Sequence, residues 1–323
     1  MSSTAPGMLV IDEDVTDPSY GHRPEDRPPE TYLRWSVINL DKPPGPTSHQ
    51  VAAWVKQISG MAKAGHGGTL DPNVSGVLPV ALADATSALA YAVSFDKQYV
   101  GVMRLHGPVS SRELARVASL MEDRIYQRPP KKSAVRRKLR TRRVHSLRLL
   151  ETVEGEVLFD LVCEPGFYVR KLVHDLGLIL GVEGHMQELR RIRSGVFCED
   201  ETLVDLFKVK AAFHKWFVED DFSLIKRTVR PYERIFAEFP KIVVRDSAVS
   251  SLCHGARLAI PGVLRLHDNI VEDGIVSLFT DKGEVIAVAR ARLNAEEVAN
   301  SPHGIAATLE RVFMPRDLYP RKW

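Results

Sequence analysis

Cysteine is scarce in this sequence, and long apolar runs are missing. The only cysteines are Cys163, Cys198 and Cys253, and their odd number and wide spacing exclude a disulfide framework or a cysteine-based metal site. No run approaches the ~20 apolar residues that a membrane-spanning helix needs. The N-terminus also lacks the basic region and apolar stretch of a secretory signal peptide. We therefore expect a cytoplasmic protein with reduced thiols.

Motifs for nucleotide cofactors and metal ions are missing as well. The chain contains neither G-x-x-x-x-G-K-[ST] nor G-x-G-x-x-G, so no phosphate-binding loop for a nucleotide cofactor is predicted. His66 has no second histidine or cysteine at metal-ligand spacing, and His174 and His185 do not supply one. We expect neither a metal ion nor a cofactor.

The charge balance is only mildly basic, but the basic residues are unevenly distributed. The formal net charge is +3, yet the stretch Lys131–Arg148 carries nine Lys or Arg and no acid. Such a block predicts a polyanionic partner, RNA or DNA. The alternative is a solvent-exposed face of a helix or strand. The predicted RNA contacts are Lys131, Lys132, Arg136, Arg137, Lys138, Arg140, Arg142 and Arg143.

A length of 323 residues predicts about two domains. Residues 1–31 contain seven acids and five prolines, so we expect them to be extended or loosely ordered. Short strands after Pro231, with a hairpin at 281–283, predict a small β-barrel. The predicted division is an extended segment at 1–31, a first domain at 32–236 and a second at 237–323, on which the N-terminal segment can pack.

Hydrophobic periodicity predicts the individual elements. A helix beginning at Thr47 or Ser48 would present Val51, Trp54, Val55 and Ile58 on one face. Residues 65–68 are predicted to form a loop. Strands are predicted at 37–40, 77–82, 99–105, 157–163 and 241–244, and helices at 114–121, 168–180, 186–192 and 248–254.

Asp71 is the strongest candidate for chemistry. Gly65, Gly67 and Gly68 precede it and would let the backbone pass close to a bulky ligand. A carboxylate in such a place can act as a nucleophile or a base. The alternative is a turn carboxylate, because an Asp-Pro step commonly opens a turn. Arg170, on an otherwise apolar helix, is a candidate partner for it, although its head group can instead reach water.

Six stretches resemble one known family. NLDKPPGPTS, KAGHGGTLDP, KQYVG, YQRPPKKSAV, GFYVRKLVHDLG and LRRIRSGVF occur in the order seen in TruB-type pseudouridine synthases. Three features are most similar to the dyskerin branch in its archaeal form: the motif GHGGTLDP, the N-terminal extension and the short interval between KQY and YQRPP. Members of this branch are the catalytic subunits of H/ACA ribonucleoproteins. The resemblance implies an α+β fold, with a mixed-sheet catalytic domain and a small C-terminal β-barrel PUA domain.

The resemblance also implies roles for individual residues. Asp71 matches the catalytic aspartate, Tyr99 the tyrosine that stacks on the target base, and Tyr168 and Arg170 the third motif of the family. Phe167 departs from the family, which usually has threonine there. Residues implied to support the site are Lys42, Pro43, His66, Gly67 and Leu189.

The implied reaction is the isomerisation of uridine to pseudouridine, which needs no cofactor. The implied partners are an H/ACA guide RNA, a substrate rRNA or tRNA, and small partner proteins of the ribonucleoprotein, in the cytoplasm of an archaeal cell or the nucleolus of a eukaryotic one. Two alternatives stay open. The chain could modify the T-arm of tRNA without a guide, or it could be a non-catalytic RNA scaffold.

Overall fold

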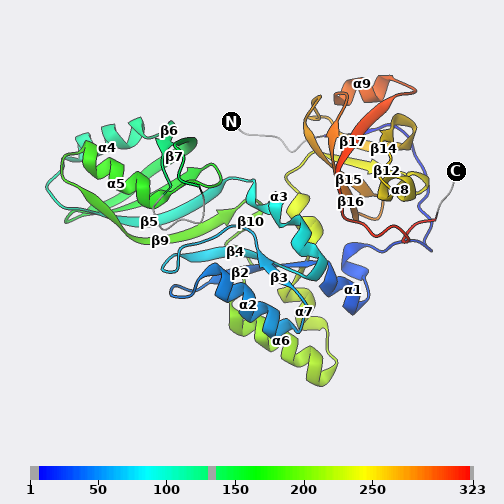
Figure 1. The fold of residues 1–323 in the computed structure, drawn as a ribbon, viewed down its shortest axis with the longest axis horizontal. Coiled ribbons are helices and arrows are strands. Elements are labelled where there is room, and N and C mark those ends of the chain that lie inside the picture. Colours follow the sequence, from blue (N-terminus) through cyan, green and yellow to red (C-terminus); the bar gives the residue numbers. More distant parts are fainter. Residues whose placement is uncertain (1–6, 130–135, 321–323) are drawn as a thin grey trace. The chain divides into compact units, whose positions relative to one another are not determined.

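A computed structural model describes residues 7–129 and 136–320 of the chain (Figure 1). The predicted RNA contacts Lys131 and Lys132 lie outside the described residues. No helix in the described parts of the chain combines the length and the apolar character needed to cross a membrane. The mixed helix and sheet content confirms the predicted α+β fold class.

The chain forms two compact units, one of which is built from both ends of the sequence. The first unit is Ser36–Arg230, and the second combines Met1–Trp35 with Pro231–Trp323. This division falls after Arg230, earlier than the predicted division after residue 236. The aromatic residues just beyond it explain the difference, because the rings of Tyr232 and Phe236 pack against Phe313 inside the second unit.

The first unit is organised around one long mixed sheet. Its strands lie in the order β11-β2-β4-β9-β5-β8-β7-β6, with β3 beside β4 and β10 beside β9. Most neighbours are antiparallel, whereas β4 and β9 run parallel. The strands are β2 (Ser36–Lys42), β3 (Ala64–His66), β4 (Ser75–Leu82), β5 (Lys97–Leu105), β6 (Asp123–Gln127), β7 (Arg140–Val153), β8 (Glu156–Cys163), β9 (Gly184–Ser194), β10 (Phe197–Cys198) and β11 (Arg230–Pro231).

The helices of this unit cover parts of the sheet. In Figure 1, α4 and α5 lie over the strands at one end, and α2 and α6 lie together at the other. The predicted helices at 114–121 and 168–180 are confirmed as α4 and α5, within a few residues at each end. The helices are α2 (Ser48–Ser59), η2 (Ala83–Ala88), α3 (Leu89–Val93), α4 (Ser111–Leu120), α5 (Val169–Ile179), α6 (Leu206–Glu219) and α7 (Ser223–Thr228).

Helix α2 begins where the sequence predicts. The Thr47 side chain accepts a hydrogen bond from the backbone of Gln50, whose side chain accepts one from the backbone of Thr47, so the two form a capping box. Val51 and Val55 are fully buried, as expected. Trp54, expected on the same face, is only partly covered, with 42% of its surface exposed.

The predicted helix at 186–192 is wrong, since this segment lies within strand β9. It pairs with β5 on one side and begins a parallel pairing with β4 on the other. Leu189 and Arg191 are both buried, which is the two-residue period of a strand. Hydrogen bonds from two neighbouring strands outweigh the local helical preference that the sequence suggested.

The second unit contains a seven-stranded sheet in the order β1-β14-β12-β15-β16-β17-β13. This order ends at β1 and β13, so the sheet is half a barrel and not a closed one. The elements are β1 (Met8–Val10), η1 (Pro24–Asp26), α1 (Pro29–Arg34), η3 (Tyr232–Phe236), β12 (Lys241–Val244), α8 (Asp246–Cys253), β13 (Leu258–Ala259), η4 (Ile260–Gly262), β14 (Val263–His267), β15 (Ile275–Thr280), β16 (Val285–Ala291), α9 (Ala295–Asn300) and β17 (Ile305–Val312).

The predicted hairpin is confirmed by β15 and β16. Its turn places Gly283 at φ +88°, a left-handed conformation that glycine adopts without strain. Val276, Leu278 and Ile286 from the two strands lie in the apolar core of the unit, which α8 and α9 complete.

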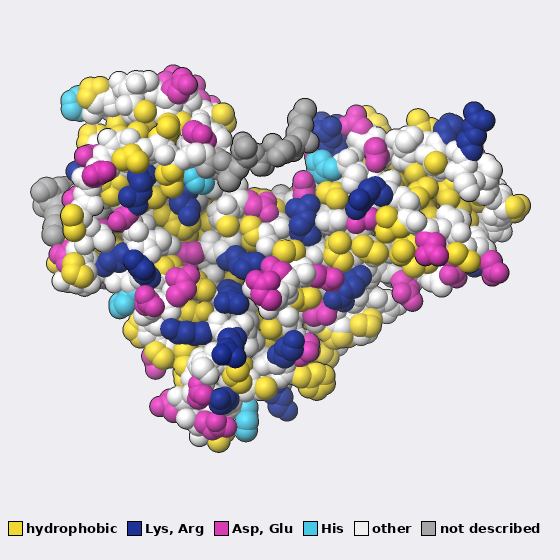
Figure 2. Space-filling view, turned by 180° about the vertical axis from the view of Figure 1, so that it is seen from behind, with side chains coloured by type: hydrophobic (Ala, Val, Ile, Leu, Met, Phe, Trp, Pro, Cys, Tyr) yellow, Lys and Arg dark blue, Asp and Glu magenta, His cyan; other side chains and the backbone are white. Residues whose placement is uncertain are grey.

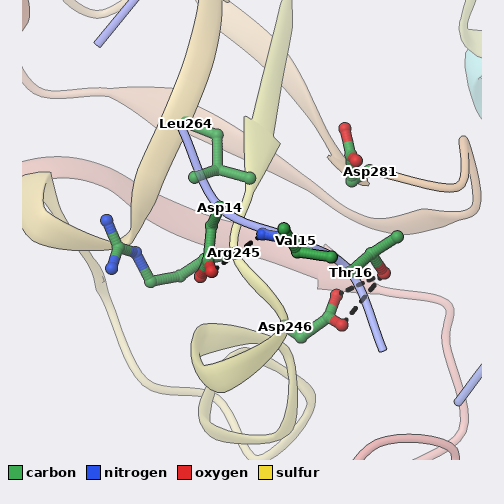
Figure 3. A pocket seen from close by; sticks show the side chains of 7 residues that line it. All are labelled: Asp14, Val15, Thr16, Arg245, Asp246, Leu264 and Asp281. Carbon is green, nitrogen blue, oxygen red and sulfur yellow. Dashed lines mark hydrogen bonds between the residues drawn. The ribbon is translucent and has the colours of Figure 1, made fainter. Parts of the chain in front are cut away.

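The N-terminal segment is part of this second unit. Strand β1 pairs antiparallel with β14, and Lys282 Nζ donates to the carbonyl of Asp17 at 2.8 Å. Thr16 donates its hydroxyl to Asp246 at the edge of a shallow pocket (Figure 3). We expected the segment to be extended or loosely ordered, and for residues 7–31 sheet pairing and side-chain contacts exclude loose order.

A buried ion pair joins the N-terminal segment to the C-terminal part of the second unit. Arg27 donates to both carboxylate oxygens of Glu233, and both side chains are at least nine-tenths buried. The positive charge of Arg27 opposes the effect of burial, which raises the pKa of Glu233. Removing either partner would lower the free energy of unfolding, because the other buried charge would be left unpaired.

Candidate active site

The two candidate charges come together in the structure. Asp71 lies on the loop between β3 and β4, and Arg170 lies in the first turn of α5. The Arg170 guanidinium donates a hydrogen bond to the Asp71 carboxylate, across 99 residues of sequence. Both side chains are about half exposed, at 52% and 56%. An exposed ion pair contributes at most about 1 kcal/mol to stability, so stability gives little reason for this arrangement.

Lys42 fixes the backbone on both sides of Asp71. Its side chain is fully buried at the end of β2, and Nζ donates to the carbonyls of Pro43, Pro72 and Val74 at 2.8–2.9 Å. Burial, followed by the positive charge of Arg191, lowers the pKa of Lys42. The three carbonyl oxygens replace the water that its ammonium group has lost. Lys42 therefore anchors the loop that presents the carboxylate.

Ser48 is a second anchor, and sequence reasoning missed it. Its hydroxyl accepts a hydrogen bond from the Leu70 N–H at 2.9 Å and donates one to the Leu70 carbonyl at 3.2 Å. Leu70 immediately precedes Asp71. Ser48 is fully buried, and a buried hydroxyl needs a partner, but the sequence alone does not show this burial. The backbone is thus held before Asp71 by Ser48 and after it by Lys42.

Tyr99, Leu189 and Arg191 share one face of the sheet. Tyr99 is opposite Arg191 in the β5–β9 pairing, and Gly101 is opposite Leu189. Tyr99 and Leu189 are both buried. Burial raises the pKa of Tyr99, with a smaller contribution in the same direction from the charge of Asp71. The tyrosine is therefore a neutral phenol at neutral pH.

Arg191 is the main residue of the site that sequence reasoning missed. Its side chain is 1% exposed, hydrogen-bonds Tyr99, and donates to the carbonyls of Val77 at 2.8 Å and Gly68 at 3.2 Å. Burial lowers the pKa of Arg191, and the interaction with Tyr99 opposes this. Reading 186–192 as a helix concealed the residue, since only a strand places it opposite Tyr99.

We expected Gly65, Gly67 and Gly68 to leave space for a bulky ligand, but two of them, Gly65 and Gly67, pack against neighbouring side chains instead. Residues 64–66 form strand β3 on β4 and are not a loop. A Cβ added at Gly65 would lie 3.0 Å from Leu89, and one at Gly67 would lie 3.3 Å from Ala92. These glycines let β3 approach the segment that follows β4.

His66 is the last residue of strand β3, five positions before Asp71. Its ring packs edge-on against His49 with centroids 4.6 Å apart. Burial, followed by the charges of His49 and Arg191, lowers the pKa of His66 to about 4. The imidazole is therefore neutral at neutral pH, as a packing residue beside the loop would be.

Tyr168 is the residue immediately before α5, two positions from Arg170. Its ring is partly buried, and the guanidinium carbon of Arg140 lies 5.0 Å from the ring centroid. Phe167, where the sequence departs from the expected family pattern, is 8% exposed and packs in the interior. The structure thus places Tyr168 at the point from which the helix carries Arg170 toward Asp71.

The side chains of the basic stretch differ in how exposed they are. Arg136, Arg137, Lys138 and Arg143 are exposed, whereas Arg140 and Arg142 are partly buried. Two arginines of the stretch form ion pairs. Arg143 Nε lies 3.5 Å from Asp123 Oδ1, and Arg148 Nη2 lies 3.3 Å from Asp160 Oδ2. On the face of the molecule shown in Figure 2, Lys and Arg side chains are likewise interspersed with Asp and Glu side chains.

Metal ligands do not gather near these residues. Within residues 7–129 and 136–320, no three His, Cys, Asp or Glu side chains are placed to hold a metal ion. The arrangement offers a fixed carboxylate, a guanidinium paired with it, and two aromatic rings. These groups can act on an electrophilic or acidic carbon while a planar base stacks beside them.

Known families match successive parts of the chain. The DKCLD (NUC011) domain matches residues 4–52, and the N-terminal domain of TruB family pseudouridylate synthases matches residues 56–169. The C-terminal domain of tRNA pseudouridylate synthase B matches residues 170–237, and the PUA domain matches residues 240–313. Together these matches include every residue described above for the candidate site.

Similarity to individual proteins extends over nearly the whole chain. The probable tRNA pseudouridine synthase B of Pyrococcus horikoshii is 46% identical over 317 residues, covering 98% of this chain and 95% of the relative. A chain in the crystal structure of a Cbf5-Nop10-Gar1 complex is 45% identical with a TM-score of 0.91, covering 98% of this chain and 97% of that one. A chain in the structure of an H/ACA RNP bound to a substrate RNA containing 2′-deoxyuridine is 43% identical with a TM-score of 0.92, covering 99% and 98%.

Proposed function

Because this chain belongs to the TruB family of pseudouridine synthases, we propose that it is the catalytic subunit of an archaeal-type H/ACA ribonucleoprotein. In this assembly it converts uridine to pseudouridine in ribosomal RNA, at positions selected by a guide RNA. The observation that carries the proposal is the near full-length similarity to a chain in an H/ACA RNP bound to substrate RNA. The cytoplasm of an archaeal cell is the compartment that fits this activity.

Asp71 is the proposed catalytic group. The target uridine first leaves its stack, so that its ribose can reach the carboxylate. Asp71 then either attacks C1′ or removes the C2′ proton, and the N1–C1′ bond breaks. The detached uracil rotates, and C5 bonds to C1′. On the first route the Asp71–C1′ bond breaks as this bond forms, and on the second Asp71 returns the proton to C2′. The C5 proton leaves and N1 takes up a proton, so the product is an isomer of the substrate and no co-reactant is consumed.

Arg170, Tyr99 and Tyr168 are proposed to assist this step. The Arg170 guanidinium pairs with the carboxylate through a hydrogen bond and fixes its direction. Tyr99 and Tyr168 provide rings on which the detached uracil can stack while it turns. Since burial raises the pKa of Tyr99, it works as a neutral stacking group and not as a resting base. Lys42, Pro43, His66, Gly67 and Leu189 support the loop and the pocket wall.

Target selection is proposed to come from partners. Residues 237–323, which include the PUA match, would anchor the guide RNA, while base pairing between guide and target selects the uridine. The catalytic unit, Ser36–Arg230, would read backbone shape and charge. Small proteins of the H/ACA ribonucleoprotein are the proposed protein partners, as in the Cbf5-Nop10-Gar1 complex.

The guide dependence can be tested with the purified full-length chain. A ribosomal RNA fragment and a tRNA T-arm are each incubated with the chain, with and without guide RNA and the partner proteins, and pseudouridine is mapped by sequencing. We expect modification of the ribosomal fragment only with a guide, and a change in the guide's pairing sequence should move the modified position. Equal modification of ribosomal RNA without a guide would contradict the proposal.

A guide-independent tRNA pseudouridine synthase is the second candidate. The observation in its favour is the name of the Pyrococcus horikoshii relative, a probable tRNA pseudouridine synthase B. Modification of the T-arm by the chain alone would support this candidate. If neither RNA is modified under any condition, the chain is an RNA scaffold and not an enzyme.

The exposed part of the basic stretch predicts a salt effect. Replacing Arg136 and Arg137 by glutamate should weaken RNA binding and reduce the slope of log affinity against log salt by roughly two, since each lost phosphate contact reduces it by about one. Affinity is measured by filter binding at several salt concentrations. Lys226→Glu with Arg227→Glu, exposed on α7, makes the same charge change as a control. An unchanged slope for the first variant, or an equal change for the control, would contradict the assignment.

A further inference from the structure

Gln127 makes two hydrogen bonds to the backbone of Tyr168. It is the last residue of β6, and its side chain is fully buried. The Tyr168 N–H donates to Oε1 at 2.9 Å, and Nε2 donates to the Tyr168 carbonyl at 3.1 Å. A buried amide in this position satisfies a backbone donor and acceptor together, as a neighbouring strand would. The sequence separation of 41 residues shows that this is a tertiary contact.

Arg140 contacts the same segment, residues 166–168, from the neighbouring strand. It begins β7 and lies directly opposite Gln127 in the β6–β7 pairing, so the two side chains are on one face. Nη2 of Arg140 donates to the Gly166 carbonyl at 2.5 Å, and the guanidinium carbon lies 5.0 Å from the Tyr168 ring centroid. A guanidinium at this distance from an aromatic face makes a favourable cation–π contact.

The segment held in this way is the start of α5. The Tyr168 carbonyl accepts the first backbone hydrogen bonds of the helix, from the N–H groups of Lys171 and Leu172, both at 3.1 Å, and the side chain of Tyr168 does not cap this end. Gln127 donates to the same carbonyl. Arg170 follows two residues later and contacts Asp71. The position and direction of the first turn, and with them the position of Arg170, therefore depend on the two residues at the end of the β6–β7 pair.

We propose that Gln127 and Arg140 are positioning residues for the isomerisation, holding Tyr168 and Arg170 in the geometry that Asp71 requires. This inference rests on the proposed function. It also separates Arg140 from the phosphate-binding residues to which its sequence neighbours belong. The Arg140 side chain is partly buried, its head group is engaged by Gly166 and Tyr168, and Nε is buried without an acceptor among the described residues. Arg136, by contrast, is exposed.

The test separates a positioning role from RNA binding. Single-turnover pseudouridine formation at saturating substrate RNA, and RNA affinity against salt concentration, are measured for the assembled complex containing the full chain. Gln127→Glu keeps the shape and the acceptor but places an oxygen where Nε2 donates. Arg140→Ala removes the guanidinium, and Arg140→Lys keeps the charge without the planar group. A displacement of about 1 Å at reacting groups can cost about 10²-fold in rate.

We expect Gln127→Glu and Arg140→Ala to lower the saturated rate roughly 10- to 100-fold, with little change in the salt slope. Arg140→Lys should recover part of the rate, because lysine can still reach the Gly166 carbonyl. Arg136→Ala should instead weaken affinity and flatten the salt dependence. Gln57→Glu, an exposed residue of α2, is the control for the added charge and should keep the wild-type rate. Thermal melting shows which variants remain folded.

Two results would overturn the inference. In the first, Arg140→Ala keeps the saturated rate and loses affinity with a flatter salt slope, which makes Arg140 a phosphate ligand. In the second, Gln127→Glu remains folded and keeps the wild-type rate. Absence of pseudouridine from the wild-type complex would contradict the proposed function, and this outcome is distinct from both. If Gln127→Glu does not fold, the Arg140 pair of variants decides the question.

Discussion

Replacing Asp71 by asparagine is expected to lower the rate of pseudouridine formation by at least about 10⁴-fold. The asparagine side chain has nearly the same shape, so the loop held by Lys42 and Ser48 keeps its backbone conformation. Its amide oxygen can still accept a hydrogen bond from Arg170. It carries no negative charge, however, and is neither a nucleophile for C1′ nor a base for the C2′ proton. Single-turnover product formation at saturating RNA measures the loss.

RNA affinity and a second aspartate provide the controls for this prediction. Affinity for substrate RNA should stay within about threefold, because phosphate contacts supply most of the binding. Asp175→Asn makes the same chemical change in α5, on a side chain that pairs with Lys171, and should keep the wild-type rate. A normal rate for Asp71→Asn would end the catalytic assignment. A parallel loss of RNA binding would assign Asp71 to binding instead.

Replacing Lys42 by methionine is expected to affect both stability and rate. Methionine fills much of the same volume but leaves the carbonyls of Pro43, Pro72 and Val74 without the donor they share. An unsatisfied buried polar group costs about 1–3 kcal/mol, so the free energy of unfolding should fall by about 3 kcal/mol. Since the loop on both sides of Asp71 loses its anchor, the saturated rate should fall as well, by roughly 10²-fold.

Chemical denaturation followed by circular dichroism checks the stability of this variant, and the single-turnover assay checks its rate. Lys63→Met is the matched control, because the Lys63 side chain is exposed and its loss should change the free energy of unfolding by no more than about 0.5 kcal/mol. An unfolding midpoint equal to that of the wild type would show that Lys42 does not anchor the loop. A stable variant with normal activity would remove it from the site altogether.

Much of the fold follows from local patterns in the sequence. The alternation in residues 99–105 and 157–163 predicts strands that the structure extends by one or two residues. The start of α2 follows from its capping residues. The segment 186–192 was predicted as a helix from local periodicity, whereas its pairing with β4 and β5 is a property of the folded chain. The burial of Arg191 inside the sheet has no local signature.

The candidate site divides in the same way. Asp71, Tyr99, Tyr168 and Arg170 lie in motifs that can be recognised along the chain. The contacts that hold them join residues far apart in sequence, such as Ser48 with Leu70 and Gln127 with Tyr168. Single serine and glutamine residues carry no mark of such a partner. Gly65 and Gly67 show the reverse case. Their local pattern suggested space for a ligand, whereas side chains distant in sequence fill that space in the fold.

The second unit contains the first and the last residues that the structure describes, with the catalytic unit inserted between them. On the ribosome, Ser36–Arg230 can complete its sheet as soon as it has emerged. The earlier segment, including Arg27, must wait for Glu233 and strand β14 to be made. Deleting the residues before Ser36 would therefore expose the edge of β14 that β1 covers. It would also leave the buried Glu233 carboxylate without its partner Arg27. Separate production of the second unit requires its two pieces to be supplied together.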